Sequence, residues 1–367
     1  MSHSPARSAG LIIRQVSPSN LETPFHALGE RITANGQFYQ RSHFPVPTLQ
    51  AESWRLTVRG RVMSPLKLSL DDLRALPETT VTTTMECAGN GRVHLSPRMP
   101  GVQWDLGAVG TAQWTGVLLR DVLQHAGVES GSLEVVLQGA DCGTLTDPGR
   151  TPGDIHYARS LPLAKATEDV LLAYAMNGQP LAPDHGFPLR AVVPGWYGMA
   201  AVKWLTTVQI TDRPFQGFFQ TVDYAYWQQT DDLPPQLVPL STMLVKAQIA
   251  RPAPHDAVVA GSHCEVTGAA WTGEGVVTRV EVSADGSESW ADADFLDPAE
   301  TGVWRRWHYS WDVPPRPGPV TLLARATDSA GRTQCAGHDP GRGGYMINFP
   351  LPVPVTVTPT SSTSEAP

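Results

Sequence analysis

Hydrophobic and polar positions follow different patterns in the two halves of the chain, and the two patterns predict different architectures. In the first half, Ser69-Leu-Asp-Asp72 has the form of a capping box and predicts a short helix through Ala75. The β-branched run at residues 80–85 predicts a strand. Apolar residues at helical spacing predict a second helix, which Thr115 would cap and Gly127 would terminate.

Residues 169–176 and the dipeptide Asn177-Gly178 predict a strand that enters a tight hairpin turn. No βαβ repeat is visible in this half of the sequence. We therefore expect an α+β domain with mixed sheets and not a doubly wound fold.

Short alternating runs dominate the second half. They cover residues 264–268, 276–283, 304–313 and 320–327, and turn signals such as Asp285-Gly286 separate them. Several short strands at near-regular spacing predict a β-sandwich of about 100 residues. The predicted fold class is α+β, with a mixed α/β domain followed by an all-β sandwich.

The composition of the sequence changes at residues 231–239, where DDLPPQLVP contains three prolines in nine residues. We place the domain boundary there. The predicted organisation is a lead-in at 1–30, a first domain at 31–235, a second domain at 236–350 and a disordered tail at 351–367, which is rich in Pro, Ser and Thr.

Composition and charge remove several classes of function. The 367 residues include 33 Gly and 33 Pro, and the formal net charge is −8. An acidic chain without a run of Lys or Arg has no electrostatic footprint for nucleic acid or for an anionic membrane. The most apolar stretch, 189–205, contains Arg190, Pro194 and Lys203, which disfavours a membrane span. With no secretory signal visible near Met1, we expect a cytoplasmic protein, or a periplasmic one if an export signal lies outside this chain.

Cys87 is the residue best placed for chemistry. It follows the predicted strand and precedes a turn with Gly89, Asn90 and Gly91. A thiolate at such a transition can ligate a soft metal or attack a substrate. The alternative is a buried hydrophobic cysteine, which is the common case. A Cys/His hydrolase is another alternative, because histidines also lie in this half, at His43, His94, His156 and His185, and spacing does not choose among them.

The segment from Asp184 to Arg190 places a histidine and an arginine around a Gly and a Pro that prevent a helix between them. A rigid loop of this kind presents His185 and Arg190 to one anion, and the planar fork of Arg suits phosphate. The alternative is an ordinary turn with a solvated arginine. Further on, Lys203 follows a glycine-containing loop that matches neither a P-loop nor a dinucleotide fingerprint.

Seven segments, in order along the chain, resemble the sulfite oxidase family of molybdopterin-dependent oxidoreductases, and in particular its bacterial, haem-less members. The matching segments are Arg41-Ser-His43-Phe-Pro-Val-Pro47, Glu86-Cys87-Ala-Gly-Asn-Gly-Arg92, Gly101-Val-Gln-Trp104 with Trp114-Thr-Gly116, Gly139-Ala-Asp141, Tyr157 to Pro162, Asp184 to Arg190, and Val202-Lys203-Trp204. The resemblance covers about Thr33 to Tyr345.

The resemblance implies one molybdenum atom bound by one molybdopterin and by a protein cysteine, which would be Cys87. It also implies the residues that hold the pterin and its phosphate: Tyr39, Gln40, Arg41, Ser42, His43, Asp141, His185, Arg190, Ala201, Val202 and Lys203. No haem is expected in this chain, because no Cys-x-x-Cys-His sequence occurs in it.

The family's substrate pocket would fall on Arg41, Arg92 and Trp104, with Arg305 of the second domain as a further arginine. An ordinary sheet position is the alternative for Arg305. The sequence differs from the animal and plant enzymes in having Gly91 before Arg92, a residue near Pro100 in place of a lysine, and Phe215 in place of a pocket tyrosine. The sequence of the Cys87 segment is more similar to bacterial members of the family, including sulfane dehydrogenase subunits.

The resemblance thus implies a molybdenum enzyme that oxidises sulfite, a small anionic sulfur substrate, to sulfate. Its electrons would pass to an external c-type cytochrome or haem subunit, and an immunoglobulin-like second domain would form a homodimer. The alternatives are oxidation of sulfane or organic sulfur and reduction of sulfoxides or nitrate on the same cofactor. A binding protein with a merely buried Cys87 is the alternative from outside the enzymes.

Overall fold

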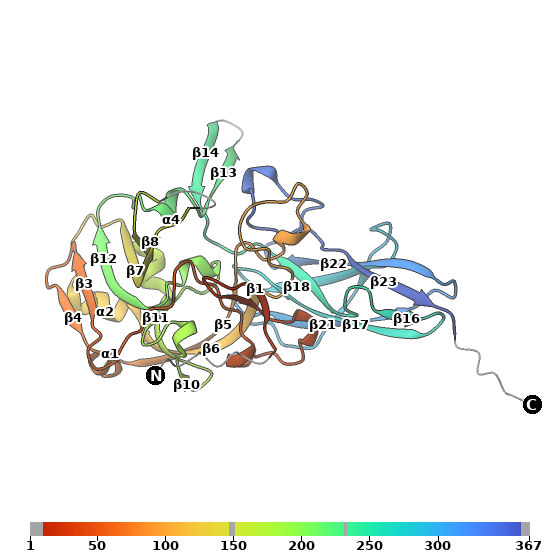
Figure 1. Cartoon of the computed structure of the whole chain (residues 1–367), viewed down its shortest axis with the longest axis horizontal. Helices are drawn as coiled ribbons and strands as arrows, with labels where there is room; N and C mark the ends of the chain where they lie inside the picture. The colour runs from red at the N-terminus through yellow and green to blue at the C-terminus, as the bar shows by residue number, and fades with distance from the viewer. Residues whose placement is uncertain (1–9, 147–150, 231–232, 361–367) are drawn as a thin grey trace, which may run out of the picture. The chain divides into compact units, whose positions relative to one another are not determined.

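The computed structural model describes residues 10–146, 151–230 and 233–360, and Figure 1 shows the elements of the chain. Contacts divide the chain into two compact units. The catalytic unit, as we call the first, comprises Met1–Thr23, Ile32–Met243 and Asp339–Ile347. The second unit, the sandwich unit, comprises Pro24–Arg31, Leu244–His338 and Asn348–Pro367. The chain therefore passes from one unit to the other more than once.

The catalytic unit is built on two mixed or antiparallel sheets. One has the strand order β10-β9-β6-β5, with β11 also paired to β9, and all its pairs are antiparallel. The other has the order β4-β3-β12-β7-β8, in which β12 and β3 are parallel. The strands are β3 (Leu56–Gly60), β4 (Leu66–Leu68), β5 (Glu78–Glu86), β6 (Val109–Leu118), β7 (Glu134–Gly143), β8 (Ile155–Pro162), β9 (Leu171–Met176), β10 (Gln179–Pro180), β11 (Arg190–Val192) and β12 (Leu205–Thr211).

Two hairpins complete the strands of this unit. They are β1 (Ile12–Gln15) with β2 (Asn20–Glu22), and β13 (Ala225–Thr230) with β14 (Leu233–Pro239). The second hairpin covers most of the segment in which the sequence predicted a domain boundary, and the sandwich unit begins at Leu244.

The helices of the catalytic unit are short: α1 (Leu70–Arg74), α2 (Leu119–Ala126), α3 (Leu163–Glu168) and α4 (Phe218–Thr221). The capping box before α1 is confirmed, because Ser69 Oγ accepts from Asp72 N and the Asp72 carboxylate accepts from Ser69 N. The strand predicted at residues 80–85 is confirmed as part of β5, and the hairpin after Met176 is confirmed as β9 and β10.

The predicted start of the second helix at Thr115 is wrong. Thr115 lies in β6, paired with Thr80 of β5 and Ala175 of β9, and α2 begins only at Leu119. Pairing on both edges satisfies the backbone of residues 115–118 as strand, which overrides the local helical spacing. The predicted end is confirmed, because Gly127 follows α2 with φ 67° in the left-handed region.

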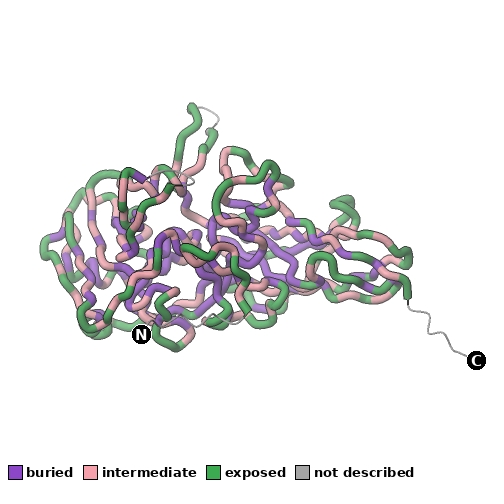
Figure 2. The backbone as a smooth tube through the Cα atoms, viewed as in Figure 1, coloured by how far each residue is buried: buried purple, intermediate pink, exposed green. Residues whose placement is uncertain are grey.

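The sandwich unit packs two sheets against each other, with the orders β15-β17-β21-β20 and β16-β23-β22-β18-β19. Its strands are β15 (Lys246–Arg251), β16 (Ala257–Val259), β17 (His263–Trp271), β18 (Val277–Ser283), β19 (Ala291–Asp292), β20 (Asp294–Phe295), β21 (Arg305–Asp312), β22 (Gly318–Asp328) and β23 (Val353–Thr358). Buried and half-buried positions alternate along the second half of β22. Figure 2 shows the backbone coloured by burial. The four runs predicted from the sequence are confirmed in β17, β18, β21 and β22, and so is the fold class.

The prediction of a disordered tail from residue 351 is wrong for residues 353–358. They form β23, which pairs with β22 and in parallel with β16, and Val353, Val355 and Val357 are buried in the core. The alternation of Val with Pro or Thr is a strand period that the Pro/Ser/Thr composition concealed. The rest of the predicted tail beyond residue 360 lies outside the described residues.

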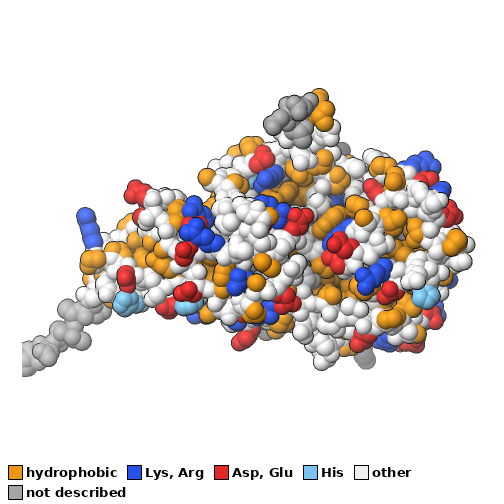
Figure 3. Space-filling view, turned by 180° about the vertical axis from the view of Figure 1, so that it is seen from behind, with side chains coloured by type: hydrophobic (Ala, Val, Ile, Leu, Met, Phe, Trp, Pro, Cys, Tyr) orange, Lys and Arg blue, Asp and Glu red, His pale blue; other side chains and the backbone are white. Residues whose placement is uncertain are grey.

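Basic and acidic side chains are interspersed over the face shown in Figure 3. Within the described ranges, no helix is long and apolar enough to cross a membrane.

Candidate active site

Cys87 is the first residue after β5, and hydrogen bonds fix the turn that follows it. Cys87 N donates to Ala108 O at 2.8 Å, and Asn90 N donates to Cys87 O at 2.9 Å. The side chain of Asn90 closes the turn, accepting from Ala108 N at 3.1 Å and donating to Glu86 Oε1 at 3.1 Å. The thiol is therefore held in one place, and Cys87 is 7% exposed.

Two cavities of the catalytic unit meet at Cys87. The cofactor cavity, as we call the first, is lined by Phe38, Tyr39, Gln40, Arg41, Ser42, His43, Met85, Cys87, Asp141, Tyr157, Asp184, His185, Arg190, Gly198, Met199, Ala201, Lys203, Trp204 and Tyr224. The substrate cavity has a volume of about 350 Å³ and is lined by Arg14, Gln15, Pro18, Arg41, His43, Cys87, Arg92, Gly101, Val102, Gln103, Trp104, Leu145, Asp223, Tyr224 and Tyr345. Arg41, His43, Cys87 and Tyr224 line both, so the thiol lies where the two spaces join.

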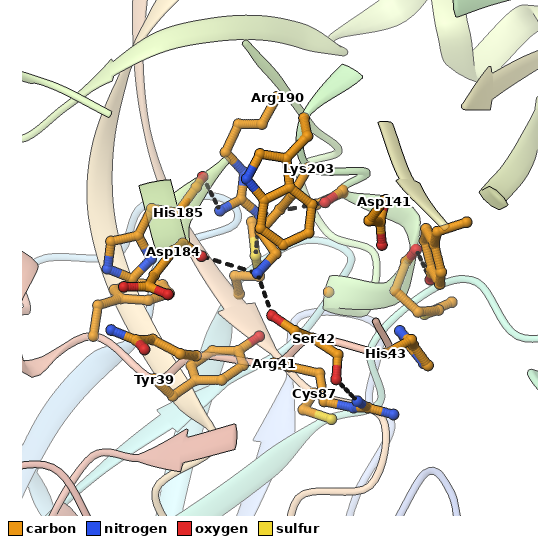
Figure 4. A pocket seen from close by; sticks show the side chains of 18 of the residues that line it. Tyr39, Arg41, Ser42, His43, Cys87, Asp141, Asp184, His185, Arg190 and Lys203 are labelled. Carbon is orange, nitrogen blue, oxygen red and sulfur yellow. Dashed lines mark hydrogen bonds between the residues drawn. The ribbon is translucent and has the colours of Figure 1, made fainter. Parts of the chain in front are cut away.

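Basic side chains converge on the cofactor cavity, and neutral oxygens hold them (Figure 4). Arg190 donates to His185 O at 3.1 Å and to Ala201 O at 3.3 Å. Lys203 donates to Ser42 Oγ at 3.1 Å and to Asp184 O at 2.9 Å. Among the described residues neither side chain forms an ion pair, so their positive charge is not cancelled by a directly bound carboxylate.

Burial is the main cause of the shifted pKa values in this cavity, and it outweighs the effect of the nearby carboxylates on Lys203. Burial lowers the pKa of Lys203 to about 7, and the nearby Arg190 charge adds to this. Burial also lowers the pKa of Arg190 to about 10 and that of His185 to about 3. For Asp141, burial raises the pKa to about 6. A bound anion would raise the pKa of the basic groups again, because it favours their charged forms.

The substrate cavity contains two arginines that are likewise held by neutral groups. Arg92, 4% exposed, donates to Gly344 O at 2.9 Å and to Val102 O at 2.8 Å. Arg41 donates to Asn20 Oδ1 at 3.3 Å and to Ser42 O. Burial raises the pKa of the Cys87 thiol, and the charge of Arg41 acts in the opposite direction.

Three glycines surround the guanidinium of Arg92. A Cβ added at Gly89, Gly101 or Gly344 would lie closer than 3.0 Å to an atom of this group. Of the glycines that the sequence placed beside Cys87, Gly89 therefore allows the approach of this arginine, and Gly101 and Gly344 do so from other segments.

The sequence analysis placed Phe215 at the position of the family's pocket tyrosine, but the structure places other residues there. Phe215 is not among the residues that line either cavity, whereas Tyr224 lines both and Tyr345 lines the substrate cavity. The Tyr224 hydroxyl lies 2.7 Å from His43 Nε2. Residues 215–227 hold several aromatic candidates, and only the folded chain distinguishes the one that faces the cavities.

The structure brings together most of the residues predicted from the sequence. Cys87, Arg41, Arg92 and Trp104 line the substrate cavity. Every predicted cofactor-binding residue except Val202 lines the cofactor cavity. Val202 is fully buried and joins β11, accepting from Ala191 N at 2.8 Å.

Arg305 lies in the sandwich unit, at the start of β21. Its guanidinium donates to Asp297 O at 3.1 Å and to Val277 O at 2.9 Å, and it stacks over the ring of Phe295. All of these contacts of the Arg305 side chain lie within the sandwich unit. A role of Arg305 at the substrate site stays a prediction.

Comparison with known proteins agrees with this geometry. A family model described as an oxidoreductase molybdopterin binding domain matches residues 43–219, and one described as a Mo-co oxidoreductase dimerisation domain matches residues 239–340. Sulfite oxidase of Gallus gallus is 38% identical over 90% of this chain and 74% of its own length. The mitochondrial sulfite oxidase of Rattus norvegicus is 37% identical over 91% of this chain, which spans 63% of that protein.

A solved structure, the sulfane dehydrogenase SoxCD from Paracoccus pantotrophus, matches with a TM-score of 0.79 and 29% sequence identity. The match covers 96% of this chain and 85% of that one. Fold and site together define a molybdenum-dependent oxidoreductase. The chain belongs to the sulfite oxidase family of these enzymes.

The residues present fit the molybdenum cofactor of this family. Asp141 Oδ1 is buried and has no hydrogen-bond partner among the described residues, so it is an acceptor that can take a donor such as those on a pterin ring. The cations Arg190 and Lys203 suit an anionic phosphate. The Cys87 thiol is a soft donor of the kind that binds such metals.

Proposed function

We propose that this enzyme oxidises sulfite to sulfate and passes the electrons, one at a time, to an external c-type cytochrome. The observation that carries the proposal is the substrate cavity, in which Arg41 and Arg92 converge beside Cys87. Among the described residues, neither arginine is paired with a carboxylate, so both charges remain for an anion. Sulfite is a small anion that needs such converging cations.

The balanced reaction is SO₃²⁻ + H₂O → SO₄²⁻ + 2H⁺ + 2e⁻. Cys87 would hold the molybdenum cofactor, which would supply the oxygen-atom transfer and the storage of two electrons. Arg41 and Arg92 bind and orient the anion, and the buried indole of Trp104 closes one wall of the cavity.

Tyr224 and His43 complete the site at the junction of the two cavities. Burial and the charges of Arg41 and Lys203 hold the pKa of His43 well below its usual range, so the imidazole is neutral at pH 7. A neutral imidazole can accept the hydrogen bond of Tyr224, which leaves the orientation of that hydroxyl defined.

For the cofactor, we propose that the basic groups Arg190 and Lys203 contact the phosphate and that Asp141 accepts from the ring. Tyr39, Gln40, Ser42, His43, His185 and Ala201 line the same space and would enclose the group. Val202 does not line this space. Its carbonyl accepts from Ala191 N, and we propose that this bond positions the neighbouring Ala201 and Lys203.

Oxidation of a larger sulfane or organic sulfur species is the second candidate. It is favoured by the cavity of about 350 Å³, which lies within the range of pockets for larger ligands and exceeds what one sulfite needs. The likeness to the sulfane dehydrogenase SoxCD points the same way.

The test is a substrate panel on purified protein with its molybdenum and pterin content measured. We expect sulfite-dependent reduction of ferricyanide and of a c-type cytochrome, with Cys87→Ser inactive and its molybdenum absorption spectrum altered. Activity with thiosulfate or a protein-bound persulfide and none with sulfite would transfer the proposal to the second candidate. Full activity in Cys87→Ser would contradict both.

We further propose that the sandwich unit forms a homodimer, which the match to a dimerisation domain supports. Light scattering on the purified chain should give twice the mass of 39.6 kDa. A monomer at micromolar concentration would count against it.

A further inference from the structure

A return segment, Asp339–Ile347, belongs to the catalytic unit although it lies in sequence between β22 and β23 of the sandwich. Three consecutive residues of this segment contact the cysteine loop. Gly344 O accepts from Arg92 Nε at 2.9 Å, the Tyr345 ring lies 5.0 Å from the Arg92 guanidinium carbon, and Met346 N donates to Ala88 O at 2.8 Å. The segment therefore holds the loop that presents Cys87 and Arg92.

Tyr345 also reaches the opposite wall of the substrate cavity. Its hydroxyl donates to Asp223 Oδ1 at 2.8 Å, and its ring lies 5.1 Å from the ring of Tyr224. One side chain thus contacts Arg92, Asp223 and Tyr224, and all four residues line the substrate cavity.

Arg92 needs such support because its side chain is long. A free arginine loses rotamer entropy when its side chain is fixed in one place. The backbone acceptors Gly344 O and Val102 O hold two of its nitrogens, and the Tyr345 ring supplies an aromatic face for its guanidinium. A cation on an aromatic face keeps its charge available to a second, anionic partner.

We propose that Tyr345 is a positioning residue that sets the affinity of the substrate cavity for an oxyanion. Its ring holds the Arg92 guanidinium, and its hydrogen bond to Asp223 holds the ring. This inference rests on the proposed function, in which the cavity binds an oxyanion. Tyr345 takes no part in the chemistry itself, so its loss changes binding and not the chemical step.

The expected effects follow from what each variant keeps. Tyr345→Phe keeps the ring over Arg92 and loses the anchor to Asp223, so the KM for sulfite should rise about threefold. Tyr345→Leu loses both and should raise KM at least tenfold. In both variants kcat should stay within about twofold of the wild-type value, because the groups at the junction with Cys87 are unchanged.

The chain supplies a matched control outside the cavities. The Tyr174 hydroxyl donates to Glu78 Oε2 at 2.7 Å, and its ring lies 5.6 Å from the Arg74 guanidinium carbon. This trio repeats the tyrosine, carboxylate and arginine of the cavity, but none of its members lines either space. Tyr174→Phe should leave KM unchanged.

A binding measurement separates this inference from the proposed function. Titration calorimetry with inorganic sulfate, on preparations matched for molybdenum content, should give the lowest dissociation constant for the wild type, a higher one for Tyr345→Phe and the highest for Tyr345→Leu. If the wild-type protein binds sulfate but does not oxidise sulfite, the proposed function fails and the order of the sulfate constants still decides the inference.

Two results would overturn the inference. One is an unchanged sulfate affinity in Tyr345→Leu, and this includes a variant that only lowers Tm or the active fraction, as a purely structural residue would. The other is a wild-type protein that binds no sulfate, which removes the oxyanion site and the proposed function together.

Discussion

The basic side chains that line the two cavities of the catalytic unit have different partners from three arginines of the sandwich unit. In the catalytic unit, the buried cations Arg92, Arg190 and Lys203 are held by carbonyl and hydroxyl oxygens. In the sandwich unit, Arg306 pairs with Asp297, Arg325 with Glu281, and Arg332 with Asp328. Both arrangements satisfy the donors, but only the second neutralises the charge.

This difference separates a stabilising use of charge from a functional one. A buried cation without a counter-ion costs free energy. The lowered pKa values of Lys203 and Arg190 show that cost, and burial is its main cause. Under the proposed function, an anionic cofactor and substrate would complete the pairs in the catalytic unit when they bind, whereas the three pairs in the sandwich are already complete.

The largest expected effect comes from removing a cation of the cofactor cavity. Lys203→Met should lower the molybdopterin content of purified protein at least tenfold, and activity with it, because the anionic group loses a partner. The same change should raise the Tm of the cofactor-free protein, because burial disfavours the charged form of this amine more than the nearby Asp141 and Asp184 favour it. Cofactor content is measured by fluorescence of the oxidised pterin.

Arg325→Met in the sandwich is the matched control for this change. It should leave cofactor content unchanged and lower Tm, since it breaks the pair with Glu281. If the two variants changed stability in the same direction, the contrast between the units would be lost.

The second effect concerns the substrate. Arg92→Gln should raise the KM for sulfite at least thirtyfold and lower kcat much less, because Arg92 mainly supplies charge to the bound anion. Steady-state kinetics with ferricyanide measures both constants. An unchanged KM would show that Arg92 does not contact the substrate.

The third effect is a difference in acid sensitivity between the units. The pKa of His185 falls from its usual 6.5 to about 3 in the folded chain, mainly through burial. The imidazole of His185 therefore binds a proton more readily in the unfolded chain than in the folded one. The free energy of unfolding is highest above pH 6.5, and it decreases as the pH falls from 6.5 toward 3. At pH 5 this loss amounts to about 2 kcal/mol.

In the sandwich unit, the carboxylates Asp297 and Asp328 have pKa values below their usual range because arginine and backbone donors outweigh burial. Their stabilisation is lost only below about pH 4. Hydrogen exchange at pH 5 should thus show increased opening in the catalytic unit first, and His185→Gln should reduce this difference. Equal opening of the two units at pH 5 is the contradicting result.

The smallest effect is expected from a sandwich pair. Asp297→Asn should cost about 1 kcal/mol of unfolding free energy, because the amide keeps some hydrogen bonds to Arg306 but loses the charge. Denaturant titration measures this cost, and sulfite KM should not change. A rise in KM would indicate that the contrast between the units is not one between function and stability.

Several features of the fold were predictable from local sequence. The capping box at Ser69 could be predicted, because the N-cap residue interacts with the residue three positions later, within one turn. The strands of the sandwich could also be predicted, because the alternation of side chains with a period of two is a local property. Thr115 was misassigned because pairing with β5 and β9, which no local pattern reports, decides its conformation.

Cys87, Arg92 and Arg190 were recognisable in the sequence because each lies in a short segment with a distinctive arrangement of Gly, Pro and polar residues. Tyr224 and Tyr345 were not recognised. Tyr224 is one of several aromatic residues in its segment, and Tyr345 lies at the far end of the chain. Nothing in their neighbours marks them as residues of the cavity.

The sequence by itself therefore determined the class of fold, and it pointed to the cysteine and to most of the basic residues that line the two cavities, since these depend on residue type and on spacing over a few positions. Only the tertiary structure decided which oxygens hold each cation, and hence whether its charge stays free. It also brought Gly344 and Tyr345 against Arg92, across 252 positions of sequence in the case of the bond to Gly344. The physical reason is that burial and pairing of a charge depend on everything packed around it, and those neighbours come from distant parts of the chain.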